Sequence, residues 1–198
     1  MEEEIRLERC SGAALARYVP DLARLRITVF REFPYLYDGD MDYEQNYLRN
    51  YAQHPSAVIV IALAGDRVVG AATGMALRDE CDEFKKPFVG SPFDIDKIFY
   101  CAESVLDAKW RGRGLGHRFF HEREAHAAEL GGFTHFAFCA VDRPADHPRR
   151  PADYRPLDPF WQRRGYTRHP GLTTEFVWKD LDETAASPKQ LTYWLKPA

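Results

Sequence analysis

The sequence predicts one domain of the mixed α/β class, with a parallel strand pair at its centre and antiparallel strands around it. Residues 98–141 have the order strand, glycine turn, helix, strand, which is typical of a βαβ unit with a right-handed crossover. Residues 57–77 have the pattern of a hairpin with a Gly65–Asp66 turn. The 198 residues are 45% hydrophobic, without a repeat or clear linker, so we expect residues 1–198 to form a single domain.

The individual elements follow from apolar spacing and turn residues. The N-terminal half predicts a strand, two helices and a hairpin: Ile5–Arg9, Pro20–Arg31, a helix after Asp40 that carries Tyr43, Tyr47 and Tyr51, Ala57–Ala64 and Arg67–Leu77. The second half predicts a helical turn, the βαβ unit, a short helix and two closing strands: Asp82–Lys86, Ile98–Leu106, a helix ending near Leu130, Phe133–Val141, Phe160–Arg164, Thr173–Lys179 and Gln190–Lys196. The proline-rich loop 144–159 is long for a compact domain, and such loops are often functional.

Charge and cysteine content argue against several classes of protein. The formal net charge is −3, whereas nucleic-acid-binding domains are usually basic. No apolar run approaches the roughly 20 residues that span a bilayer, and the N-terminus MEEEIRLERC is acidic where a signal peptide is basic and apolar. The four cysteines lie far apart without a CxxC pair, which fits free thiols. We expect a cytoplasmic protein without a nucleic-acid or membrane partner; a homodimer stays open.

The stretch 110-WRGRGLGHRFF-120 places three glycines where a helix begins. Glycine costs a helix about 0.5–1 kcal/mol relative to alanine, so these glycines need another reason. A helix N-terminus leaves about four N–H groups unpaired and carries roughly half a positive charge. A turn without side chains lets an anion reach those groups, and arginines surround this one. The stretch predicts a phosphate or diphosphate site; the alternative is a glycine turn with solvated arginines. It fits neither a P-loop nor a Rossmann loop.

The same residues resemble a known family. Arg111–Gly116 matches the [RQ]-x-x-G-x-[GA] signature of the GNAT superfamily of acyl-CoA-dependent N-acetyltransferases. The residues before it, Ser104–Arg111, resemble that family's fourth strand, apolar-x-V-x-P-x-x-R, with Ala108 in place of the usual proline. Downstream, 160-FWQRRGY-166 is similar to the family's F-Y-x-x-x-G-F segment. The order of elements fits the family from Ile5 to about Lys196.

The resemblance implies a fold and a cofactor site. The two parallel strands would splay apart and hold the thioester of acetyl-CoA between them. The backbone of Ser104, Val105 and Leu106 would pair with the pantetheine arm. The coenzyme A diphosphate would bind to the amides of the glycine turn, which consists of Arg111, Gly112, Arg113, Gly114, Leu115, Gly116 and His117.

Glu103 is the one acid in the apolar run IFYCAESVL, so it is the first candidate for a general base. By alternation it shares a face with Phe99, Cys101 and Val105. The alternative is a structural ion pair. Some GNAT members use a glutamate on this strand, but at the opposite parity, where Tyr100 and Ala102 stand here. A bulge in the strand would restore the match.

The general acid is less obvious from the sequence. Trp161 stands where many relatives have a tyrosine that protonates the thiolate, and an indole does not release a proton at useful pH. That role is therefore vacant, or it is filled by Tyr154 of the proline-rich loop, by Tyr166 or by water. Tyr154 and Tyr100 are the candidate catalytic tyrosines. The histidines of 121-HEREAH-126 are spaced one residue too far for an HExxH site, so we expect no metal.

The segment 35-YLYDGDMDYEQNY-47 would cover the acceptor pocket by the same resemblance. Tyr35, Tyr37 and Asp38 are therefore the candidate acceptor-binding residues. The acids of the segment would attract a cationic amine, or form a solvated helix start. We expect direct acetyl transfer from acetyl-CoA to a primary amine of a small molecule. The alternatives are a non-catalytic acyl-CoA-binding module and a protein-interaction role for the 144–159 loop.

Overall fold

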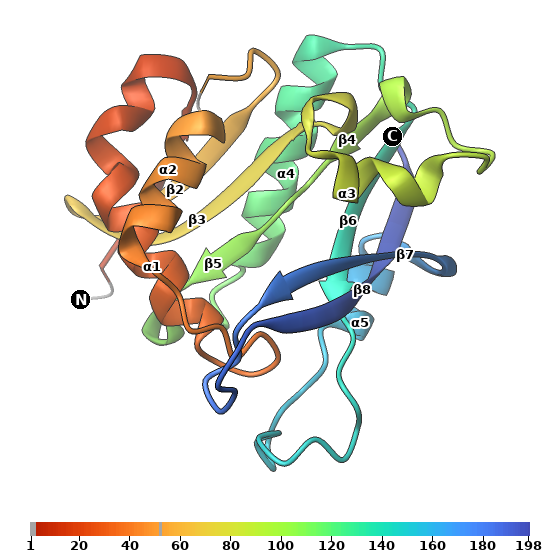
Figure 1. Cartoon of the computed structure of the whole chain (residues 1–198). Coiled ribbons are helices and arrows are strands. Elements are labelled where there is room, and N and C mark those ends of the chain that lie inside the picture. Colours follow the sequence, from red (N-terminus) through yellow and green to blue (C-terminus); the bar gives the residue numbers. More distant parts are fainter. Residues whose placement is uncertain (1–2, 52) are drawn as a thin grey trace.

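The computed structural model describes residues 3–51 and 53–198. One eight-stranded sheet has the order β1-β2-β3-β4-β6-β8-β7, with β5 also paired to β3 (Figure 1). The strands are β1 Ile5–Cys10, β2 Val58–Ala64, β3 Arg67–Ala76, β4 Ile98–Tyr100, β5 Ser104–Leu106, β6 His135–Val141, β7 Thr167–Trp178 and β8 Ser187–Pro197. The α-helices are α1 Val19–Phe30, α2 Met41–Tyr51, α3 Asp82–Lys85, α4 Leu115–Leu130 and α5 Asp158–Arg163. The mixed α/β prediction is confirmed.

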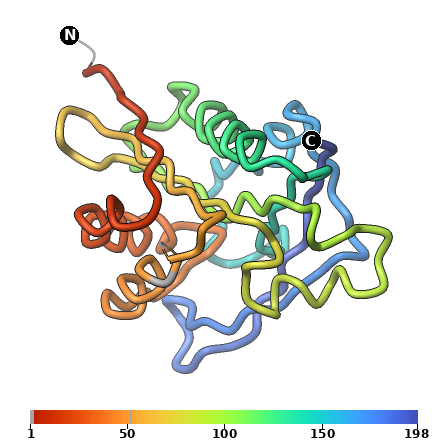
Figure 2. Tube along the Cα trace, turned by 90° about the horizontal axis from the view of Figure 1, so that it is seen from above, coloured from red at the N-terminus to blue at the C-terminus, as the bar shows by residue number. Residues whose placement is uncertain are grey.

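Two apolar layers enclose the sheet. Strand β2 is buried along its whole length, as its continuous apolar run requires when helices cover both faces. Ile59 and Ile61 pack in one layer with Leu22 of α1, whereas Val60 packs in the other with Phe119 of α4. Helices α1 and α2 therefore cover one face and α4 the other, as Figures 1 and 2 show.

The predicted strand Ile98–Leu106 is in fact two short strands. β4 pairs in parallel with β6, as predicted, and antiparallel with β3, while β5 pairs with β3. Ala72 lies opposite Ser104 and Met75 opposite Tyr100, so three residues, 101–103, face two residues of β3. The extra residue is a β-bulge, which bends and twists a strand. It separates β5 from β6 and opens the wedge that the family resemblance implied.

Smaller differences have local causes. The 3-10 helix Gly12–Tyr18 lacks a sequence pattern strong enough to predict it. Strand β7 begins at Thr167 rather than Thr173, because Pro170 and Gly171 are absorbed in a register shift between His169 and Thr173. Helix α5 begins at Asp158, with a proline in its first turn. No helix of the described residues is long and apolar enough to cross a bilayer.

Candidate active site

A cleft of ≈ 1000 Å³ opens where β5 and β6 diverge. Its walls come from the α1–α2 turn, β5, the start of α4, the end of β6 and the proline-rich loop with α5. Phe33, Ser104, Gly114, Val141 and Tyr154 each represent one of these segments in the lining. Ligands of open α/β sheets bind at such a divergence of strands, and the volume is in the range of cofactor sites.

One edge of β5 turns unpaired backbone groups to this cleft. On its other edge, the carbonyl of Glu103 and the N–H of Asp107 each form a 2.9 Å hydrogen bond with β3, and Val105 between them is in register with β3. Backbone groups alternate in direction along a strand, so those of Ser104 and Leu106 point away from β3. An extended ligand in the cleft can pair with them as a further strand would.

Helix α4 begins at the cleft with a turn that an anion can approach closely. Gly112 and Gly114 have φ angles of 76° and 75°, a conformation that strains residues with a side chain. A Cβ at either position would meet nothing within 4 Å, so the space before the turn is open. The N–H groups of 112–116 have no hydrogen-bond acceptor in the part of the chain that the structure describes. Gly116 serves packing instead, because its Cβ would lie 3.3 Å from Phe160 of α5.

The arginines beside this turn are held by protein groups. Arg111 forms a two-point ion pair with Glu32, at 2.6 and 3.0 Å, which ties the turn to the end of α1. The guanidinium of Arg113 lies 4.7 Å from the ring centre of Trp110. His117 lines the cleft. At this turn, the donors offered to an anion are therefore chiefly backbone amides.

Glu103 lies at the bulge and forms an ion pair with Arg26 of α1. The same guanidinium pairs with Glu44 of α2, whose side chain is fully buried. Glu103 also lines the cleft, so its carboxyl group connects the α1–α2 layer with the ligand space. A cavity of ≈ 10 Å³ beside Glu103, Arg26 and Thr73 has room for about one water.

The prediction that Glu103 shares a face with Phe99 and Cys101 is wrong. Phe99 packs in the α4 layer, whereas Glu103 and Val105 border the small cavity under α1 and α2. The bulge shifts the alternation by one residue and so exchanges the faces. Glu103 therefore points to the α1–α2 side of the sheet. The sequence alternation alone would have placed Ala102, not Glu103, on that side.

The model of the acetyltransferase (GNAT) family matches residues 22–151, which is more than half of the chain. The chain belongs to the GNAT acetyltransferase family. Members of this family are acyltransferases that use acetyl-CoA.

Solved structures agree with this GNAT fold. An acetyltransferase from Thermus thermophilus is similar over 100% of both chains, with a TM-score of 0.59 and 16% identity. A ribosomal-protein-alanine N-acetyltransferase from Brucella melitensis is similar over 98% of this chain and 99% of its own (TM-score 0.63, 13% identity). The PaiA N-acetyltransferase of Thermoplasma acidophilum, in complex with coenzyme A, covers the same shares (TM-score 0.56, 9% identity). A search of curated proteins finds no match.

The candidate tyrosines of this GNAT acetyltransferase differ in position. Tyr154 lines the cleft, and its ring packs edge-on at 4.7 Å against Phe33. Tyr100 is buried in β4, outside the cleft lining, and its hydroxyl lies 3.0 Å from Cys139 Sγ. Burial raises the pKa of both hydroxyls. Trp161 lines the cleft from α5. In the described residues, no group of three or more His, Cys, Asp or Glu side chains is placed to hold a metal ion.

Of the three predicted acceptor-binding residues, only Tyr35 lies at the cleft. Tyr35 lines it, with its ring 4.7 Å from Phe30. Tyr37 forms a β-bridge to Asp180 away from the cleft, and Asp38 is tied to Lys179 at 2.8 Å. The remaining acids of the segment also lie outside the lining: Asp40, Asp42 and Glu44. The segment therefore contributes an aromatic wall to the cleft rather than negative charge.

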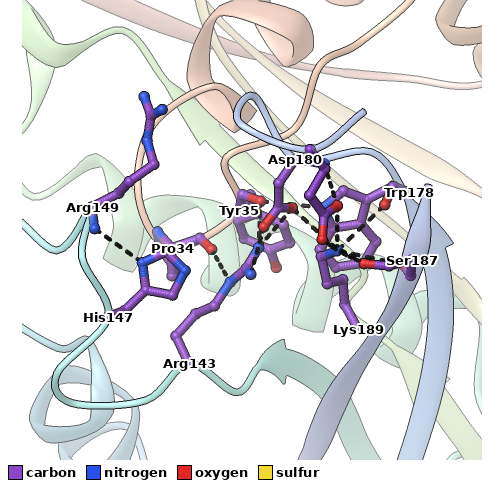
Figure 3. Close-up of polar contacts among 10 residues, drawn as sticks. Pro34, Tyr35, Arg143, His147, Arg149, Trp178, Asp180, Ser187 and Lys189 are labelled. Carbon is purple, nitrogen blue, oxygen red and sulfur yellow. Dashed lines mark hydrogen bonds and ion pairs between the residues drawn. The ribbon is translucent and has the colours of Figure 1, made fainter. Parts of the chain in front are cut away.

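Sequence reasoning missed several arginines of the cleft, and two of them, Arg143 and Arg123, have largely buried side chains. Arg143, just after β6, donates to the carbonyls of Pro34 at 2.7 Å and Tyr35 at 2.8 Å and pairs with Asp180 at 2.7 and 3.0 Å (Figure 3). No local pattern marks it, because its partners are far away in the sequence. Arg123 of α4 also lines the cleft, with 1% of its surface exposed.

The sequence does carry a signal for Arg123. Leu115, Phe119, Arg123 and Ala127 are spaced by four residues, which places them on one side of the helix, and all are buried. A charged residue within an apolar stripe of this kind has a structural or functional reason.

Proposed function

We propose that this GNAT enzyme transfers the acetyl group of acetyl-CoA directly to a primary amine of a small molecule. One observation carries the proposal: the unpaired amides of the α4 turn and the free edge of β5 line one cleft. The pantetheine arm would pair with Ser104 and Leu106, while Val105 holds the strand to β3. The Leu106 carbonyl already accepts from Arg111 at 3.1 Å, so its N–H is the free group of that residue.

The diphosphate would bind to the amides of residues 112–116. Arg111 and Arg113 border the turn, and His117 follows it in the first turn of α4. The charge of a diphosphate there is opposite to the partial charge of the helix end. This support is electrostatic and geometric, and it does not depend on a single side chain.

For the chemistry, we propose Glu103 as the general base, directly or through a water. The amine nitrogen attacks the acetyl carbon, the C–S bond breaks with its electron pair on sulfur, and the nitrogen loses a proton to the carboxylate. The small cavity beside Glu103 supports the water-mediated route. Tyr154 is the proposed proton donor because it lines the cleft, whereas Tyr100 is left out of the proposal because it does not.

The acceptor is proposed as a small molecule because the α1–α2 turn and the proline-rich loop both wall the cleft. Tyr35 is the acceptor-side residue that we retain from the sequence prediction. Tyr37 and Asp38 lie outside the lining and are not carried into the proposal. The 144–159 loop packs on the body through Tyr154 and Phe33, which favours a wall of the cleft over a docking site for other proteins.

A binding experiment tests the cofactor site. Coenzyme A at ~100 times its Kd should stabilise the protein by about 2.7 kcal/mol, read as a thermal shift. Gly114→Glu should abolish the shift, because the side chain blocks the amides and repels the diphosphate. Gly90→Glu is the matched control, since Gly90 has a similar φ of 78° and a Cβ there also meets nothing within 4 Å.

Both substitutions should cost about the same stability, so only the ligand response separates them. A ligand-free protein that shows no shift with millimolar coenzyme A would overturn the proposal. If coenzyme A binds but no thiol is released from acetyl-CoA with a panel of small amines, a non-catalytic acyl-CoA-binding module is the better conclusion.

A further inference from the structure

Arg123 is a buried cation that the proposed chemistry has not yet used. Its Nη1 donates to the carbonyls of Thr73 at 3.1 Å and Glu103 at 3.2 Å, and its Nε donates to Phe119. Nη2 is buried and has no hydrogen-bond partner in the described residues. No carboxylate of those residues lies within 4.0 Å of the guanidinium, as an ion pair would need. A buried charge is normally paired, so this arginine is prepared for a partner that the chain itself does not supply.

The place of Arg123 matches the place where a thioester would lie. From Leu115 to Arg123, α4 rises about 12 Å. From Leu106 back to Ala102, the chain of β5 and the bulge spans about 13 Å. An acyl-CoA whose diphosphate binds at the α4 turn and whose arm follows β5 therefore brings its sulfur to the level of the bulge. The contact of Arg123 with the Glu103 carbonyl fixes the guanidinium at that level.

The positive charge of Arg123 also acts on a sulfur atom of the protein, the thiol of Cys101. Cys101 lines the same part of the cleft. Burial raises the pKa of its thiol, and the Arg123 guanidinium opposes that increase more than any other group does. The other charges nearby are engaged: Glu103 pairs with Arg26, and Glu124 pairs with Arg164 and Lys196.

We propose that Arg123 stabilises the coenzyme A thiolate that acetyl transfer releases, an inference that rests on the proposed function. When the amine displaces the thioester, the electron pair of the C–S bond goes to sulfur. The guanidinium faces that negative charge while the proton from the amine is held on Glu103. The thiolate then takes a proton from Tyr154 or solvent. The guanidinium stabilises the sulfur until that proton arrives, which Trp161 on the cleft wall does not supply because indole releases no proton at useful pH.

The test reads the thiol of bound coenzyme A and needs no acceptor. Thiolate absorbance is titrated with pH in the complex with coenzyme A, and the spectrum of the complex with desulfo-coenzyme A is subtracted to remove the four protein cysteines. In the unmodified protein the pKa of the bound thiol should lie about one to three units below that of free coenzyme A. Arg123→Gln and Arg123→Met should remove this difference, and Arg123→Lys should keep most of it.

Arg9→Gln is the matched control, because Arg9 pairs with Glu122 and Glu129 on the outer side of the same helix. It should leave the pKa of the bound thiol unchanged. At a pH below the pKa of the bound thiol, calorimetry should give coenzyme A affinities within about twofold in all variants, because coenzyme A then binds as the thiol. In contrast, kcat should fall ~10²-fold in Arg123→Gln once an acceptor is known.

Two outcomes would overturn the inference and leave the proposed function standing. One is a bound thiol in the unmodified protein whose pKa is not below that of free coenzyme A. The other is the same thiol pKa in Arg123→Gln and the unmodified protein, with only a lower melting temperature, which would make Arg123 a structural support of the bulge. If the glutamine and methionine variants do not fold, two results still overturn the inference: a bound thiol in the unmodified protein whose pKa is not lowered, and a lowered pKa that is lost in Arg123→Lys. Failure of the unmodified protein to bind coenzyme A would overturn both.

Discussion

At the scale of residues, three charged side chains lie between α1 and the sheet, beside the cleft. Glu103 and Glu44 share the guanidinium of Arg26, which also lies 4.5 Å from the ring centre of Tyr47. Of these three charged side chains only Glu103 also lines the cleft, so it alone can reach a bound acceptor.

Two substitutions distinguish the proposed role of Glu103 from that of Glu44. Glu103→Gln should lower the rate of acetyl transfer ~10²–10⁴-fold with little change in coenzyme A affinity, because only proton acceptance is lost. Glu44→Gln touches the same Arg26 but lies outside the cleft, so it should lower the melting temperature and leave the rate within a few-fold. Steady-state kinetics across pH and thermal unfolding provide both readouts. A Glu103→Gln enzyme with an unchanged rate at every pH would end the base assignment.

Glu80 makes the stability of the protein depend on pH. Burial raises the pKa of this carboxyl from 4.5 to about 7, opposed by the Cys81 backbone and Lys85 and reinforced by Asp79. The folded state therefore binds the proton more tightly than the unfolded state. Its contribution is complete below pH ~4.5 and is lost as the pH rises to about 7, a loss of about 3 kcal/mol.

Glu80→Gln keeps a neutral side chain at every pH, so it should raise the melting temperature at pH 8 relative to the unmodified protein and have little effect at pH 4.5. Glu83→Gln, three residues away on an exposed position, is the control and should not reproduce this pattern. Chemical unfolding at the two pH values measures the difference. Equal effects of Glu80→Gln at both would contradict the direction of the shift.

At the scale of elements, glycines of β3 determine how closely β5 and α4 approach. A Cβ on Gly70 would lie 2.6 Å from the Leu106 side chain and 3.0 Å from Phe119. The position thus allows β5 to lie against β3 and α4 to pack behind it. The bulge at 101–103 acts in the same place, because it lets the chain leave β6 while it stays paired with β3.

Gly70→Ala should therefore destabilise the protein by about 1–3 kcal/mol, the usual cost of overpacking. The displaced Leu106 should also weaken coenzyme A binding, because its N–H belongs to the proposed pantetheine edge. Gly171→Ala in β7 is the control, since a Cβ there meets nothing within 4 Å and its φ is not positive. Denaturant unfolding and calorimetry measure the two effects, and a Gly70→Ala protein as stable as Gly171→Ala would refute the packing argument.

Local patterns were sufficient to predict some elements but not others. The apolar run of β2 and the glycine turn before α4 are local, so both were predictable from sequence. The bulge was not, because it depends on the pairing of 101–103 with β3, and no residue type there demands it. Because the bulge was not predicted, the side of the sheet on which Glu103 lies was predicted wrongly. The acids of 38–44 misled for a related reason, since their partners Arg26 and Lys179 come from other elements.

At the scale of the molecule, one buried network joins two segments that border the cleft, the α1–α2 turn and the loop after β6, to the β7–β8 turn. Arg143 and Asp180 have side-chain exposures of 9% and 5%, and Lys189 continues the network to Glu183 of the β7–β8 turn. Arg143 also binds the carbonyls of the α1–α2 turn, at Pro34 and Tyr35 (Figure 3). The network therefore holds the N-terminal and C-terminal parts of the fold together beside the ligand space.

Arg143→Met should destabilise the protein by about 3 kcal/mol, the low end for a broken buried ion pair, because Asp180 loses its bidentate partner but keeps Lys189 at 3.6 Å. The double variant Arg143→Met, Asp180→Asn should recover part of that loss, since no charge is then stranded. Arg149→Met, on an exposed position of the same loop, is the control and should change stability by less than about 0.5 kcal/mol. Additive effects of the two single changes in the double variant would show that the pair is not coupled.

The position of β8 sets the moment at which the cleft wall can form during synthesis. β8 follows all the other described elements along the chain, yet it lies between β6 and β7 in the sheet. A nascent chain that ends before Ser187 thus exposes one whole edge of β6, with its hydrogen-bonding groups available to any other unpaired strand. The β6 wall of the cleft is complete only when residues 187–197 have left the ribosome. Translation that stalls just before Ser187 therefore yields a chain prone to strand pairing with its neighbours on the same polysome.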